Sequence, residues 1–129
     1  MTHAAARRLV CWGLVATWLV VIWQFGESQL VPLTSSDDGL RWFLRKSLHL
    51  AVYGILGGLL ALAIEARPRW GWVIILSLLV ALGDELHQGS VPWRAFQVHD
   101  LGIDLMGGVL GASLTGMLTT RWRPNLDSP

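Results

Sequence analysis

Ionisable and hydrogen-bonding side chains recur at helical spacing in three separate apolar parts of the sequence. Lys46, His49 and Tyr53 stand at positions i, i+3 and i+7, which place side chains on one face of a helix. Two further pairs of polar residues each lie four positions apart, namely Asp84 with Gln88 and Asp100 with Asp104. Imidazole and carboxyl groups can act as general acid and base, or as ligands of a divalent metal.

The acids are the residues that packing explains least. A charged side chain facing hydrocarbon costs roughly 2.5 to 3.5 kcal/mol, so we expect the polar faces to turn inward and satisfy one another. Asp84 is the strongest single candidate, and Glu85 beside it points about 100° away on a helix, which suits contact with water. Arg94 is the only Lys or Arg between Glu85 and the last apolar run, and its guanidinium suits a carboxylate or a lipid phosphate.

The composition indicates that these residues belong to a membrane protein. The chain has 129 residues, of which 53% are hydrophobic and 15% charged, which is more apolar side chain than a soluble core of this size buries. Lys46 is the only lysine, and no basic stripe is present, which argues against a nucleic-acid partner. Membrane lipid is the partner that the composition indicates.

Four uncharged runs supply the membrane spans, at residues 9–26, 47–64, 70–83 and 105–120. A bilayer core requires roughly 20 helical residues, so the shorter third and fourth runs must carry ionisable groups near their ends. We therefore predict an all-α fold, a four-helix transmembrane bundle that forms a single domain over residues 1–129. Its helices are expected at approximately 8–26, 44–65, 69–89 and 99–121.

The distribution of basic residues predicts the orientation of this bundle. Four spans put both termini and the loop after the second helix on one side. That side holds six arginines, against four basic residues and seven acids on the other side. The six are Arg7, Arg8, Arg67, Arg69, Arg121 and Arg123. The positive-inside rule therefore predicts that the N and C termini are cytoplasmic.

Polar residues of three predicted helices lie at similar depths in the bilayer. At about 1.5 Å per residue, His49 and Asp104 lie roughly 27 Å from the inner interface, and Tyr53 and Asp84 roughly 21 Å, in a core about 30 Å thick. We therefore predict a common polar pocket that faces the outer, non-cytoplasmic side.

Glycines in the second and fourth runs are interpreted as packing residues. Gly54 with Gly58 and Gly107 with Gly111 form two G-x-x-x-G spacings, which allow the backbones of two membrane helices to approach closely. Homo-oligomerisation through the same glycines stays open.

These motifs together resemble the VanZ-like family of small membrane proteins. The family pattern is K-x-x-H-x-x-x-Y, then D-E-x-x-Q-x-x-x-P-G-R, then an Asp, an Asn four residues later, and glycines that open the last helix. The resemblance covers the last three helices and implies a candidate ligand-binding set. Its members are Lys46, His49, Tyr53, Asp84, Glu85, Gln88, Arg94, Asp100 and Asp104.

The chain departs from the family pattern at two positions. Trp93 stands where the resemblance implies Gly, and Asp104 stands where it implies Asn. Asp104 adds a potential negative charge at the least hydrated end of the polar face that it shares with Asp100, so we expect it to be protonated or paired.

The resemblance implies a multi-pass protein of the bacterial inner membrane with a role in the cell envelope, since the family's namesake is linked to low-level resistance to the lipid-tailed glycopeptide teicoplanin. The leading hypothesis is that the pocket recognises an amphiphile, either a lipid-linked envelope precursor or a lipidated glycopeptide. This would be an antibiotic-resistance or envelope function that needs no cofactor.

Two other functions stay open. A membrane enzyme acting on a lipid-linked substrate could use His and Asp as acid and base or as metal ligands. The sequence has no H-E-x-x-H motif and no nucleophile elbow, so we assign no catalytic residue and no metal ligand. Proton or ion movement through Asp104, Asp84 and His49 is disfavoured, because only Glu65 continues a path in the inner half.

Overall fold

The computed structural model describes residues 2–27, 38–65, 69–92 and 95–121. Within these residues the fold consists of four helices without strands: α1 (His3–Glu27), α2 (Asp38–Ala63), α3 (Arg69–Gly89) and α4 (Val98–Arg121). Each of these helices is long and apolar enough to cross a membrane. The predicted all-α, four-helix transmembrane fold is therefore confirmed.

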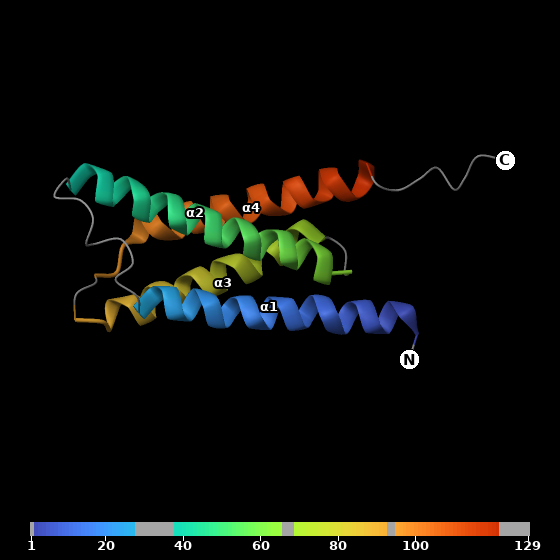
Figure 1. The fold of residues 1–129 in the computed structure, drawn as a ribbon. Coiled ribbons are helices and arrows are strands. Elements are labelled where there is room, and N and C mark those ends of the chain that lie inside the picture. Colours follow the sequence, from blue (N-terminus) through green and yellow to red (C-terminus); the bar gives the residue numbers. More distant parts are fainter. Residues whose placement is uncertain (1, 28–37, 66–68, 93–94, 122–129) are drawn as a thin grey trace.

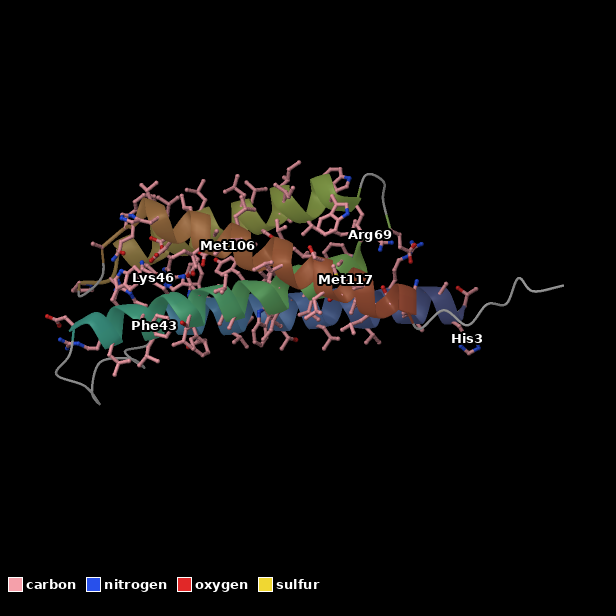
Figure 2. The ribbon with its side chains drawn as sticks, turned by 90° about the horizontal axis from the view of Figure 1, so that it is seen from above. His3, Phe43, Lys46, Arg69, Met106 and Met117 are labelled. Atoms are coloured by element: carbon pink, nitrogen blue, oxygen red, sulfur yellow. The ribbon has the colours of Figure 1, made fainter. Side chains whose placement is uncertain are left out.

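The helices run antiparallel in chain order, so α1 begins and α4 ends at the same end of the bundle (Figure 1). The closest pair is α2 and α4, and α3 packs mainly on α4. Within the described ranges α1 contacts α2 and α3 but not α4. The opposite end of the bundle, where α2 and α4 begin and α3 ends, carries Lys46 (Figure 2) and is called the polar end below.

The first two helices begin earlier than the uncharged runs predict. α1 starts at His3 and includes Arg7 and Arg8, and α2 starts at Asp38. A carboxylate in the first turn stabilises a helix because it faces the positive end of the helix dipole. Asp38 also forms an ion pair with Arg41 one turn later. Asp38 therefore extends α2 beyond its apolar run, whereas α1 begins after Thr2, whose hydroxyl oxygen accepts a hydrogen bond of 3.3 Å from the backbone N–H of Ala5.

The buried apolar core is small, and much of the apolar surface faces outward. The core draws on all four helices and includes Val15, Ile22, Leu56, Leu60, Val73, Ala81 and Ala112. Leu79, Leu114 and Met117 are each more than half exposed. Such broad apolar surfaces are rare on soluble monomers and suit contact with lipid chains.

Glycines let α2 and α4 touch through their backbones. A Cβ atom on Gly57 would overlap the backbone of Gly108, and one on Gly111 would overlap the backbone of Gly54. Small residues at such contacts are typical of membrane helices, which associate by close packing. The same interface holds the four glycines of the two G-x-x-x-G spacings, Gly54, Gly58, Gly107 and Gly111. This contact fixes the register of α2 against α4.

Side-chain contacts attach α1 to α2 and α3 at both ends and in the middle. Near the polar end, the rings of Trp23 and His87 stack with their centroids 3.6 Å apart. In the middle, the indole of Trp18 donates a hydrogen bond of 2.9 Å to the backbone oxygen of Val52. At the other end, Glu65 after α2 forms ion pairs with arginines of α1. The first helix therefore supports α2 and α3, which carry much of the candidate site.

Candidate functional site

Lys46 on α2 is buried against the start of α4. Its ammonium group forms an ion pair with Asp100 and donates a hydrogen bond of 3.0 Å to the side-chain oxygen of Gln97. The ring of Trp42 lies 5.9 Å from the same nitrogen, within reach of a cation–π interaction. Figure 2 shows Lys46 between α2 and α4, whereas Phe43 on the same helix points away from the bundle. Helical spacing thus separates a polar face from a lipid face on α2.

His49 lies one turn further into the bundle and pairs with α4. Its Nδ1 atom is 2.9 Å from Oδ1 of Asp104, and its Nε2 atom is 4.0 Å from Oδ2 of Asp100. Asp104 is completely buried. The sequence predicts that Asp104 is protonated or paired, and the structure places it in a pair with His49.

Asp84 on α3 joins α2 to α3. The hydroxyl of Tyr53 donates to Oδ2 of Asp84 over 3.4 Å, and the amide of Gln88 donates to the same oxygen over 2.9 Å. Gly26 of α1 covers this carboxyl group, since a Cβ atom there would lie 2.9 Å from Oδ1 of Asp84. Asp84 is thus held by residues of α2 and α3 under the end of α1.

The direction of Glu85 on the helix suggests contact with water, but the side chain is buried. Its side chain is only 1% exposed, and its Oε2 atom accepts a hydrogen bond of 2.8 Å from the backbone N–H of Gln97. The expectation of water contact was wrong because the segment that leads into α4 lies over this face of α3. An N–H group at the start of a helix lacks a partner within the helix, and a carboxylate there also faces the positive end of the dipole.

Eight of the nine predicted site residues therefore come together from three helices. We call them the polar cluster: Lys46, His49, Tyr53, Asp84, Glu85, Gln88, Asp100 and Asp104. None is more than 9% exposed. The ninth, Arg94, lies outside the described residues, as does Trp93, the first departure from the family pattern.

Gln97 is a site residue that the sequence did not indicate. Its side chain accepts from Lys46 and its backbone donates to Glu85, so it links α2 to α3. Its carbonyl oxygen also accepts the backbone N–H of Asp100 over 2.9 Å, as the residue before a helix does. Gln97 falls outside any helical repeat, so spacing could not reveal it.

Three members of the polar cluster are arranged as metal ligands could be. His49, Glu85 and Asp104 each offer one ligand atom, and these three atoms lie within 4.8 Å of one another. Oε1 of Glu85 and Oδ2 of Asp104 are buried and have no hydrogen-bond partner among the described residues. Lone pairs of this kind can bind a cation or accept a hydrogen bond from a ligand.

A shallow apolar groove runs along the contact between α2 and α4. It has a volume of about 530 Å³ and is lined mainly by glycines and leucines, including Leu50, Gly54, Gly58, Gly107, Gly111 and Leu114. The groove lies beyond the polar cluster along both helices, since Leu50 follows His49 and Gly107 comes three residues after Asp104, and no member of the cluster lines it. Buried charged groups and an open apolar surface therefore follow one another along α2 and α4.

Comparison with known proteins identifies one family. The sequence model of the VanZ/LLP1 family matches residues 9–119, which include most of α1 as well as the three helices that carry the motifs. No curated protein and no solved structure matches the chain.

Proposed function

The chain belongs to the VanZ/LLP1 family, and we propose that it recognises a membrane amphiphile. In this proposal the polar cluster contacts the head group, and the groove between α2 and α4 holds part of the apolar chain. The ligand is a lipid-linked envelope precursor or a lipidated glycopeptide, and the protein acts in the cell envelope or in resistance to such an antibiotic. The polar end then faces outward from the bacterial inner membrane.

The observation that carries this proposal is that the groove and the polar cluster occupy successive stretches of the same two helices, α2 and α4. Known ligand sites combine a largely apolar lining with a few polar groups that fix orientation, and the groove supplies an apolar lining. An amphiphile lying in the membrane would already have its chain at the depth of the groove. Its head group would then meet Lys46 near the start of α2.

Lys46 is the described residue best suited to an anionic head group. Its ammonium group is held by Asp100 and Gln97, and a phosphate or carboxylate of a ligand can compete for the same donors. Lys46 also lies closer to the start of α2 than His49 or Tyr53 does. A head group that enters at the polar end would therefore reach Lys46 before the deeper members.

Photo-crosslinking tests this proposal. Purified protein in lipid nanodiscs is incubated with a polyprenyl-diphosphate saccharide, or with a lipidated glycopeptide, that carries a diazirine in its apolar chain. We expect adducts on α2 and α4 peptides that line the groove, and competition by the unlabelled compound. The variant Lys46→Met is expected to reduce labelling roughly tenfold, as loss of about 1.4 kcal/mol of binding free energy would.

The matched control is Arg69→Met, which removes a charge at the opposite end of the bundle and should leave labelling unchanged. Labelling that is spread evenly over all four helices would contradict the proposal. Equal labelling of Lys46→Met and Arg69→Met would contradict it as well.

A membrane enzyme is the second candidate, and the His49–Asp104 pair favours it. A carboxylate 2.9 Å from an imidazole nitrogen can orient the ring and stabilise its protonated form, as general acid–base catalysis requires. The test is turnover of a lipid phosphate or polyprenyl-phosphate substrate by the purified protein. Activity that His49→Gln abolishes would favour this candidate, whereas binding without turnover would favour the first.

A further inference from the structure

The polar cluster contains more buried acids than buried bases. Among the residues that the structure describes, the buried carboxyl groups outnumber the buried basic groups by four to two: Asp84, Glu85, Asp100 and Asp104 against Lys46 and His49. The lysine is used by Asp100. His49 is therefore the one buried base next to both Glu85 and Asp104, and buried charges are stable only when they are paired or bind a metal.

Glu85 and Asp104 also leave one oxygen each without a partner. Oε1 of Glu85 and Oδ2 of Asp104 are buried and accept no hydrogen bond within the described residues, while the residues are 1% and 0% exposed. A protonated carboxyl group would in turn need an acceptor for its O–H. A cation can satisfy both oxygens at once.

The distances suit a bound metal ion. The Nδ1 atom of His49 lies 2.9 Å from Oδ1 of Asp104, which is a hydrogen-bond distance. Because the unpartnered Oδ2 belongs to the same carboxyl group, an ion bound there would lie next to the imidazole. The ligand atom of Glu85 is within 4.8 Å of the other two. A small movement of this side chain would complete a three-residue site.

Neighbouring contacts hold the three ligands in place. The backbone N–H of Gln97 fixes Oε2 of Glu85, which leaves Oε1 as its available oxygen. Asp100 lies 4.0 Å from the other ring nitrogen of His49 and is itself held by Lys46. Metal sites depend on such partners, because these orient the ligands and keep them basic.

We propose that His49, Glu85 and Asp104 form a binding site for a divalent cation. One imidazole nitrogen and two carboxylate oxygens are a donor set that suits Zn²⁺ or Mn²⁺, whereas Mg²⁺ and Ca²⁺ prefer oxygen alone. Three protein ligands leave coordination positions for water or for a ligand. The site joins α2, α3 and α4 at the polar end, and it does not depend on the proposed amphiphile.

The test is metal binding by the tag-free protein in detergent. After treatment with a chelator, the protein is titrated separately with Zn²⁺, Mn²⁺ and Mg²⁺, and bound metal is measured by mass spectrometry of the elements. We expect about one equivalent of Zn²⁺ or Mn²⁺ per chain and weaker binding of Mg²⁺. The variants His49→Gln, Glu85→Gln and Asp104→Asn should each reduce the affinity roughly tenfold or more.

Glu65→Gln is the matched control, because Glu65 is an acid outside the polar cluster, and it should bind metal as the original chain does. Folded variants that all bind as tightly as the original chain would overturn the proposal, and so would a chain that binds no more Zn²⁺ or Mn²⁺ than Mg²⁺.

A measurement on the unaltered chain keeps the proposal testable if a variant does not fold. Bound Mn²⁺ is paramagnetic, and pulsed electron paramagnetic resonance detects a nitrogen nucleus that coordinates it directly. We expect a coupling from one imidazole nitrogen. Its absence from the Mn²⁺-loaded protein would exclude His49 as a ligand and with it the proposed site.

Discussion

His49 of α2 and Asp104 of α4 form a buried pair, with Nδ1 of the imidazole 2.9 Å from Oδ1 of the carboxyl group. Asp104 is completely buried and His49 is 9% exposed. The pair crosses the tightest helix contact in the bundle, the one at which the glycines of α2 and α4 meet. The His49–Asp104 pair and the glycine contacts therefore hold the same two helices, α2 and α4, together.

Truncation of Asp104 is expected to destabilise the protein more than its conversion to an amide. Asp104→Ala leaves a buried imidazole without its partner, which typically costs about 3 to 5 kcal/mol when the partner is charged. Asp104→Asn keeps an oxygen that can accept from His49, so we expect a smaller loss, by at least about 1 kcal/mol. Chemical unfolding in detergent micelles measures both. Equal losses would show that the hydrogen bond contributes little.

Two glycines of α4 should respond in opposite ways to alanine. Gly111→Ala places a Cβ atom into the backbone of Gly54, and we expect a loss of about 1 to 3 kcal/mol or more, as overpacking causes. Gly102→Ala meets nothing within 4 Å and should be neutral or stabilising by up to about 1 kcal/mol, because alanine favours helix. Thermal unfolding of both variants checks this. Similar melting temperatures would contradict the close contact.

The sequence predicted the helices because apolar runs of bilayer length leave few other structures. The polar cluster was predictable for a related reason: Lys46, His49 and Tyr53 share one helical face, and so do Asp84 and Gln88. Polar residues in a span must turn away from lipid, so faces on separate helices are directed to the same interior.

The remaining features depend on how one helix approaches another. The direction of Glu85 on α3 suits contact with water, whereas the residue that covers it, Gln97, lies before α4 and outside any repeat. The Gly57–Gly108 contact falls outside the two G-x-x-x-G spacings for the same reason. Spacing reports which face a residue occupies, whereas these contacts depend on the crossing of two helices.

The ion pairs of Glu65 should make stability depend on pH at the end of the bundle opposite the polar end. The hydrogen bond from Arg8, together with the charges of Arg8 and Arg7, lowers the pKa of the Glu65 carboxyl group below its ordinary value. A group whose pKa is lowered by folding stabilises the protein above its unfolded pKa, and the effect is lost as the pH falls through the folded pKa.

The measurement compares the melting temperature of the original chain with that of Glu65→Gln. We expect a small deficit for Glu65→Gln at neutral pH, because exposed ion pairs contribute little. The deficit should shrink in acid and at high salt, which screens exposed charges. A deficit that does not change with pH or salt would point to packing of the side chain instead of its charge.

The orientation predicted from the arginines can be tested with single cysteines. Cys11 is the only cysteine of the chain, so Cys11→Ser provides a background in which Thr2→Cys and Ser90→Cys mark the two ends of the bundle. Both positions are exposed, one before α1 and the other after α3.

The positive-inside rule places Ser90 outside and Thr2 in the cytoplasm. We expect a membrane-impermeant thiol reagent to label Ser90→Cys in intact cells and Thr2→Cys only after permeabilisation. The reverse pattern would place the polar cluster near the cytoplasmic face, where a ligand arriving from outside could not reach it.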